Sequence, residues 1–279
     1  MRCRACSASA LRPYGAKEKI PLWGCRCGSL NAEVSETDLP RYGKSYEQAS
    51  FEAPDAVRRS LAESVETLGE YRQLGRWVDI GFGEGALLAE AERLGWQCAG
   101  TELSAPSLRF GASRGWDVRE RPDSWPDHSF DVVSLMEVLE HVIDPEALLR
   151  GAIRLLRPGG ALVGTTPNIE SLNFRILGIG WSVVAPPEHV TLFSSGALGQ
   201  LLGRFPLEIR YVRTTGLNPT ELMRWRKESV SATERNAGAQ RWVQATSNPV
   251  GQSAKRFANW VLNSLRAGDS LKVLATKRF

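Results

Sequence analysis

The chain has 279 residues, of which 42% are hydrophobic and 24% are charged, as in an ordinary folded globular protein. No apolar run approaches the roughly 20 residues that a membrane-spanning helix needs, and the N-terminus lacks the apolar segment of a secretory signal. We therefore expect a cytoplasmic protein without a transmembrane segment. Residues 204–279 contain 14 Lys and Arg but only 5 Asp and Glu. This basic quarter could meet an anionic substrate, a membrane or nucleic acid, or could be a solvated face.

Four of the five cysteines lie in the first 27 residues. They form two pairs about 20 residues apart, which suits a tetrahedral zinc site. The second pair is separated by one residue, where zinc-binding turns usually have two. The sequence leaves two alternatives, a set of reduced thiols or a structural Zn²⁺ ion bound by Cys3, Cys6, Cys25 and Cys27. We expect residues 1–50 to form this module and a polar linker.

After a helix expected within 51–74, strands and helices alternate. This alternation predicts a parallel sheet with helices on both faces. We expect strands at 76–80, 96–101, 116–118, 130–135 and 161–165, with helices at 86–94, 104–115 and 145–156. Further on, we expect a loop at 181–193, helices at 169–177, 194–202, 219–228 and 253–266, and strands at 207–212 and 268–276. The prediction is an α/β, Rossmann-like, doubly wound, mostly parallel seven-stranded sheet. It occupies a domain of residues 51–279 with a helical insertion at about 217–268.

The first strand of this domain runs into three alternate glycines and then directly into a helix. Gly81, Gly83 and Gly85 permit positive φ and close approach of a ligand, and the helix start offers free N–H groups. The pattern formally matches a dinucleotide fingerprint. However, Asp79 precedes the glycines, and a carboxylate suits a cationic amine better than a pyrophosphate. Glu102, at the end of the next strand, can accept hydrogen bonds from two ribose hydroxyls.

A ligand with an amino-acid end, a ribose and no phosphate satisfies both carboxylates, and S-adenosyl-L-methionine is such a ligand. With this site, the runs 78–85, 101–103, 130–142 and 156–160 resemble the class I S-adenosylmethionine-dependent methyltransferases. The runs 166–168 and 187–194, together with the cysteine-bearing start, are similar to a bacterial subgroup with small-molecule acceptors. The ubiquinone-pathway O-methyltransferases are related members of the same broad class.

The resemblance implies roles for particular residues. It implies that Leu103 packs on the adenine, and that either Glu120 or Asp123 meets the adenine amino group. The cofactor-binding residues that it implies are Asp79, Gly81, Gly83, Gly85, Glu102, Leu103, Leu135 and Met136, of which the last two would border the methionyl part.

Transfer of a methyl group to a hydroxyl also needs a base. His189, in the irregular segment after the fifth strand, and His141 are the candidates, whereas His128 should face solvent. Glu137 and Glu140 are weaker candidates, expected on a helix surface or in a supporting position.

We expect the acceptor to be a small molecule, with a hydroxyl on a sugar, a quinone-like compound or a natural-product intermediate. Tryptophans 181, 225, 242 and 260 with nearby arginines could form a lid for an anionic or lipid-linked acceptor, or pack a helical cap. The alternative functions are those of a nicotinamide-dependent oxidoreductase, a non-catalytic binding protein and a nucleic-acid methyltransferase. We expect no nucleic-acid partner.

Overall fold

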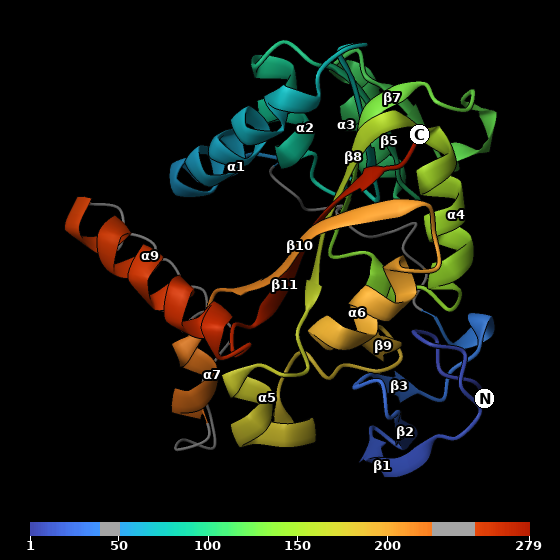
Figure 1. The fold of residues 1–279 in the computed structure, drawn as a ribbon, viewed down its shortest axis with the longest axis vertical. Helices are drawn as coiled ribbons and strands as arrows, with labels where there is room; N and C mark the ends of the chain where they lie inside the picture. Colours follow the sequence, from blue (N-terminus) through green and yellow to red (C-terminus); the bar gives the residue numbers. More distant parts are fainter. Residues whose placement is uncertain (40–50, 225–248) are drawn as a thin grey trace.

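The computed structural model describes residues 1–39, 51–224 and 249–279, and a seven-stranded sheet forms its centre (Figure 1). The strand order is β10-β11-β8-β7-β4-β5-β6, and the five strands from β8 to β6 are parallel. Strands β11 and β10 continue the sheet in antiparallel pairing. The predicted doubly wound, mostly parallel, seven-stranded sheet is confirmed. Its strands are β4 (Arg76–Ile80), β5 (Gln97–Thr101), β6 (Asp117–Arg119), β7 (Phe130–Met136), β8 (Leu156–Pro167), β10 (Leu207–Thr215) and β11 (Ser270–Lys277).

Helices cover both faces of the sheet. Alternate residues of each strand point to opposite faces, so each face presents apolar side chains against which helices pack. Trp77 of β4 packs in a cluster with residues of α1 and α2, whereas its neighbour Val78 packs in a second cluster with residues of α4 and α6. The described helices are α1 (Asp55–Leu68), α2 (Ala86–Arg93), α3 (Ala105–Ser113), α4 (Pro145–Leu155), α5 (Leu172–Leu177), α6 (Ser195–Leu202), α7 (Pro219–Arg224) and α9 (Pro249–Ser264).

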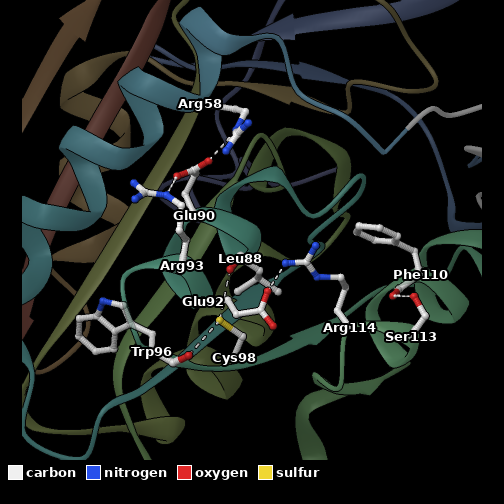
Figure 2. Close-up of polar contacts among 10 residues, drawn as sticks. All are labelled: Arg58, Leu88, Glu90, Glu92, Arg93, Trp96, Cys98, Phe110, Ser113 and Arg114. Atoms are coloured by element: carbon white, nitrogen blue, oxygen red, sulfur yellow. Dashed lines mark hydrogen bonds and ion pairs between the residues drawn. The ribbon is translucent and has the colours of Figure 1, made fainter.

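An ion-paired carboxylate joins α1 to α2. Glu90 is only 4% exposed. Its carboxylate pairs with Arg58 of α1 at 2.9 Å and with Arg93 of its own helix at 2.7 Å (Figure 2). Below it, the Cys98 thiol donates to the Leu88 carbonyl at 3.3 Å, and burial raises the pKa of this thiol to about 12. Cys98 is therefore a protonated packing residue.

The N-terminal residues form a second, smaller sheet. Strands β1 (Arg12–Lys17), β2 (Ile20–Gly24) and β3 (Leu30–Ala32) are antiparallel, and β3 pairs with β9 (Thr191–Leu192) from the main domain. Residues 31 and 32, which lie where the sequence predicts the polar linker (31–50) to begin, thus belong to a strand, and so do two residues of the expected loop 181–193. A local pattern cannot reveal this pairing because its partners are far apart in the sequence. The division of the chain at residue 50 stays a prediction, since residues 40–50 lie outside the described ranges.

Strand β8 begins earlier than the sequence predicts. Residues 157–160, between the expected helix 145–156 and the expected strand 161–165, lie inside β8. A register shift there separates the pair Phe130 and Leu156 from the pair Val132 and Ala161. Arg157, in this irregular stretch, pairs with the fully buried carboxylate of Asp131 at 2.6 Å. This ion pair lies where the strand runs through a segment rich in glycine and proline.

The described part of the predicted insertion comprises α7 and α9. Residues 225–248, including Trp225 and Trp242, lie outside the described ranges. Trp181 is 1% exposed and packs among residues of the small sheet, so it lines no lid. Trp260 of α9 is 64% exposed and stacks on Phe257 at a centroid distance of 5.9 Å.

Candidate cofactor and acceptor site

The three glycines form a tight loop between β4 and α2. Gly81, Gly83 and Gly85 have φ values of +72°, +53° and +74°. The Gly81 N–H donates to the Thr101 carbonyl at 2.8 Å, which ties the loop to the end of β5. A Cβ atom on Gly85 would lie 2.8 Å from the Trp116 ring. The loop therefore requires glycine both for its left-handed backbone and for its packing.

Asp79 lies beneath this loop, and its side chain is buried. The residue is 2% exposed, and its Oδ1 accepts a hydrogen bond from the Ser134 hydroxyl at 2.6 Å. Ser134 in turn accepts from the Trp77 indole N–H at 2.9 Å. Burial raises the pKa of Asp79 to about 7, against the Ser134 hydrogen bond, and the charge of Glu102 raises it further. A cation beside this carboxyl would stabilise its charged form, which fits a ligand with an amine.

Glu102 holds the glycine loop and the start of α3. Its Oε2 accepts from the Gly83 N–H at 2.9 Å, and its Oε1 accepts from the N–H groups of Leu103 at 2.7 Å and Ser104 at 3.1 Å. A carboxylate has about four acceptor positions, so it can take a further donor such as a ribose hydroxyl. Leu103 beside it is 57% exposed, which fits an apolar contact with adenine. The sequence did not predict that Glu102 would also tie down the loop.

The other residues expected at the cofactor vary in exposure. Leu135 is 1% exposed and packs in the core at the end of β7, and Met136 is half-buried. Glu120 and Asp123 both follow β6, and both are exposed. The structure therefore does not choose between these two acids.

Glu140 lies in a single 3₁₀ turn, η5 (Leu139–His141), that follows β7. The residue is 1% exposed, so the expected place on a helix surface is wrong. Its Oε2 accepts from the Thr166 hydroxyl at 2.9 Å, while its Oε1 is buried without a hydrogen-bond partner among the described residues. Burial, followed by the charge of Glu137, raises the pKa of Glu140 well above the usual range.

The two candidate histidines lie together beside Glu140. Their rings meet nearly edge to face, with centroids 4.6 Å apart. The Nδ1 atom of His141 lies 3.0 Å from the Glu188 carbonyl, and that of His189 lies 2.7 Å from the Val183 carbonyl. A carbonyl only accepts, so we assign a hydrogen to Nδ1 of each ring, and Nε2 is then the acceptor whenever the ring is neutral. Burial and the neighbouring His189 lower the pKa of His141, which favours this neutral form.

Glu140, His141 and His189 together form a Glu–His cluster. This cluster lies close to the glycine loop and is held by the N-terminal module. A Cβ atom on Gly81 would lie 2.9 Å from Val138, one residue before η5. The Val190 N–H donates to the Glu140 carbonyl at 2.7 Å, and Arg4 donates to the Val190 carbonyl at 3.1 Å. His128, in contrast, is exposed in a turn and lies with its Nδ1 3.0 Å from the Leu156 carbonyl.

The structure brings the four N-terminal cysteines together as thiols. The sulfur of Cys3 lies 3.6 Å from that of Cys27, and the sulfur of Cys6 lies 3.5 Å from that of Cys25. All four sulfur atoms lie within 4.8 Å of one another. A tetrahedral ion with Zn–S bonds of about 2.3 Å needs sulfur atoms roughly 3.8 Å apart, so the four residues fit zinc. The Cys27 thiol and then the Ser29 hydroxyl hydrogen-bond to Cys3 and lower its pKa to about 4, against burial.

Comparison with known proteins identifies the family. Residues 55–212, more than half of the chain, match a family model described as a methyltransferase domain. The chain belongs to this methyltransferase family. The glycine loop with its two carboxylates fits the cofactor of that family, and the protein is a class I S-adenosylmethionine-dependent methyltransferase, as the sequence predicted.

Curated relatives belong to ubiquinone biosynthesis. The methyltransferase is 27% identical over 171 residues to the ubiquinone biosynthesis O-methyltransferase of Albidiferax ferrireducens, a match that covers 55% of this chain and 68% of that protein. It is 35% identical over 120 residues to the enzyme of the same name from Xanthomonas oryzae, covering 39% of this chain and 50% of that one. These matches span about half to two thirds of the relatives' lengths.

Solved structures share the fold. A methyltransferase of Thermotoga maritima, described as a possible histamine N-methyltransferase, aligns with a TM-score of 0.51 at 22% identity and covers 79% of this chain and 89% of that one. A methyltransferase of Mesorhizobium loti aligns with a TM-score of 0.50 at 19% identity, covering 79% and 100%. At this identity the two structures support the fold alone. Within the described ranges, no helix combines the length and the apolar character needed to cross a bilayer.

Proposed function

We propose that this methyltransferase transfers the methyl group of S-adenosylmethionine to a hydroxyl of a small molecule. The observation that carries the proposal is the Glu–His cluster next to the glycine loop, formed by the buried Glu140 and the half-buried His141 and His189. The bound cofactor supplies a methyl group on a sulfonium, which is already an activated leaving group. The residues of the chain then need to align the acceptor, exclude water and remove the hydroxyl proton.

In this proposal the two acidic side chains bind different parts of the cofactor. Asp79 receives its ammonium group, and Glu102 receives its ribose hydroxyls beside Leu103, which contacts the adenine. Gly81, Gly83 and Gly85 allow the backbone to pass close to the ligand. Leu135 and Met136 border the methionyl part from the end of β7, and Glu120 or Asp123 meets the adenine amino group.

The proton acceptor is the Nε2 atom of a neutral histidine. We favour His189, because the segment that carries it lies between the last parallel strand and α6, beyond the carboxyl ends of the strands. His141 is the alternative, since the two rings are in contact. Either ring has its Nδ1 fixed by a backbone carbonyl, which directs its Nε2 away from that carbonyl.

The name of the curated relatives supports one class of methyl acceptor. Their name, ubiquinone biosynthesis O-methyltransferase, supports a hydroxyl on a quinone-like ring. A sugar or natural-product hydroxyl is the alternative, and the basic C-terminal quarter would suit an anionic or lipid-linked acceptor.

The experiment measures S-adenosylhomocysteine formation with methyl-labelled cofactor and a panel of phenolic, sugar and polyketide hydroxyl acceptors. With an accepted substrate, His189→Asn should lower kcat by about 10²–10⁴-fold, the usual contribution of a general base. Its affinity for S-adenosylhomocysteine should stay within about twofold of wild type. His128→Asn is the matched control and should keep full activity. A fully active His189→Asn together with a fully active His141→Asn would refute the assignment of the base.

We also propose that Cys3, Cys6, Cys25 and Cys27 bind a structural Zn²⁺ ion in a module of residues 1–50, which precedes the methyltransferase domain of 51–279. The four-sulfur arrangement supports this proposal. Elemental analysis of the purified protein should find one zinc per chain, lost in Cys25→Ser and kept in Cys98→Ser. Equal zinc in both variants would contradict it.

A further inference from the structure

One row of residues crosses four neighbouring strands of the main sheet, near the carboxyl ends of β7 and β8 (Figure 1). Its members, each in register with the next, are Met136 of β7, Thr165 of β8, Lys272 of β11 and Arg213 of β10. Residues directly opposite each other on neighbouring strands point to the same face of a sheet. Met136 packs against the cluster that contains residues of α1 and α2, so the row belongs to the face that these helices cover.

This row connects the proposed cofactor site to two cations. Asp79 is in register with Ser134, two residues before Met136 on β7, so its carboxyl belongs to the same face. Lys272 is two strands away from Met136, and strands lie about 4.8 Å apart, so their backbones are roughly 10 Å apart. An acceptor of one ring, with substituents at opposite ends, has a suitable size to bridge this distance.

Lys272 has a half-buried side chain and few partners for its charge. Its Nζ atom donates to the Ser64 hydroxyl of α1 at 3.2 Å, and that hydroxyl donates to the Ser60 carbonyl at 3.1 Å. An ammonium group has three N–H donors, and no carboxylate among the described residues pairs with this one. Burial and then the charge of Arg213 lower the pKa of Lys272. A bound anion would stabilise its charged form.

Arg213 places a second positive charge directly opposite Lys272. Its guanidinium lies over the Tyr211 ring, with Cζ 4.3 Å from the centroid. It forms no ion pair within the described ranges, whereas Arg210 on the same strand pairs with Glu208 at 2.6 Å. Like charges directly opposite each other destabilise a sheet. An anion between the two cations would remove this cost and accept their free N–H groups.

From this geometry we propose that Lys272 and Arg213 bind an anionic group of the methyl acceptor, a carboxylate or a phosphate. This inference rests on the proposed function, since it assumes that the acceptor hydroxyl meets the methyl group near Met136. The anion bound at one end of the row fixes the acceptor, and the hydroxyl at the other end then points to the cofactor. The enzyme therefore selects anionic acceptors over neutral ones of the same shape.

Two matched pairs of probes test the subsite. One is a dihydroxybenzoate with its neutral amide, and the other is a dihydroxybenzyl phosphate with its neutral alcohol. Calorimetry on the full-length protein saturated with S-adenosylhomocysteine measures their binding, and methyl-transfer assays measure KM and kcat. In at least one pair, wild type should bind the anion about tenfold or more tightly than its neutral partner.

The variants should change this preference and little else. Lys272→Met should remove it by raising the Kd and KM of the anion, with the neutral partner and kcat changed by no more than about twofold. Lys272→Arg keeps the charge and should retain most of the preference. Arg213→Gln should reduce it several-fold. Arg210→Gln is the matched control, because the charge of Arg210 is already paired with Glu208, and it should behave as wild type.

Circular dichroism and the affinity for S-adenosylhomocysteine test the folding of each variant. Arg213→Gln, at an exposed residue, covers the case in which Lys272→Met fails to fold. Equal binding of anion and neutral partner in both pairs by wild type, or a preference that survives in folded Lys272→Met and Arg213→Gln, would overturn the subsite. A preference that these variants abolish, without methylation of any hydroxyl, would instead overturn the proposed function and leave the subsite standing. The pair that shows the preference distinguishes a carboxylate from a phosphate.

Discussion

The ring of His189 lies nearly edge to face against the ring of His141, with the centroids 4.6 Å apart. One histidine follows β7 of the main sheet, and the other precedes β9 of the small sheet. The contact thus brings the loop after β7 together with a segment that the N-terminal module holds in place. It makes the proposed acceptor site dependent on both sheets.

The affinity for the cofactor should rise with pH because of Asp79. Its pKa of about 7 in the unliganded protein means that the carboxyl is mostly neutral at pH 6 and mostly ionised at pH 8. An ionised Asp79 attracts the ammonium group, so the affinity should rise roughly tenfold over this range. Calorimetry with S-adenosylhomocysteine at pH 6, 7 and 8 measures this affinity. Asp79→Asn should bind more weakly at pH 8 and show a flat profile. A wild-type profile as flat as that of Asp79→Asn would refute the role of this carboxyl.

The same substitution should stabilise the unliganded protein at high pH. The folded-state pKa of Asp79, about 7, exceeds the unfolded value of about 3.9. The folded state therefore binds the proton more tightly, and stability decreases as pH rises from 4 to 7. At pH 8 Asp79→Asn removes a cost on the order of 2–4 kcal/mol. Thermal unfolding at pH 5 and 8 checks this. The difference in melting temperature between variant and wild type should grow with pH, and a constant difference would contradict the prediction.

A comparison of two glycines separates backbone strain from steric overlap. Gly115 has a φ of +79°, and a Cβ there would meet nothing within 4 Å. Gly115→Ala should therefore cost about 1–2 kcal/mol through its backbone alone. Gly85→Ala adds the overlap with Trp116 to a similar φ, so urea unfolding should show a clearly larger loss. It should also weaken S-adenosylhomocysteine binding, which Gly115→Ala should not. Equal effects of the two changes would argue against a tightly packed loop.

Arg4 should affect the acceptor more than the cofactor. Its guanidinium donates to the carbonyls of Ala32 at 2.9 Å, Val34 at 3.2 Å and Val190 at 3.1 Å, so it holds β3 against the segment that follows His189. Arg4→Gln should raise the KM for the acceptor several-fold and leave the affinity for S-adenosylhomocysteine unchanged. Arg12→Gln, at an exposed arginine on β1, is the matched control. If Arg4→Gln lowered both affinities equally, the module would stabilise the whole fold and not the acceptor site.

The main domain could be predicted from sequence because its signals are local. A strand, three glycines, a helix and two carboxylates at strand ends follow one another within residues 77–102. The spacing alone places them at one edge of a parallel sheet. The pairing of β3 with β9 left no such signal, since Leu30 and Leu192 meet only through the tertiary fold.

Glu140 shows why the rest of the site could not be predicted. The run from Glu137 to His141 looks like the exposed start of a helix. In the structure it is a single tight turn whose carboxylate points inward to Thr166. Burial of this acid depends on the end of β8 and on the segment that carries Val190, and neither is adjacent to it in sequence. A Glu-His pair directly after a predicted strand is the only local sign of its role.

The pairing of β3 with β9 also sets an order of events during synthesis. Residues 30 and 31 leave the ribosome early, but their partners at 191 and 192 follow only after the greater part of the main domain has been made. At about 5–20 residues per second, roughly 10–30 s pass before the small sheet can be completed. During this interval β3 can pair with β2 but not yet with β9. The pairing of β3 with β9 is thus the last strand pairing of the small sheet to form during translation. His189, the proposed catalytic histidine, lies two residues before β9.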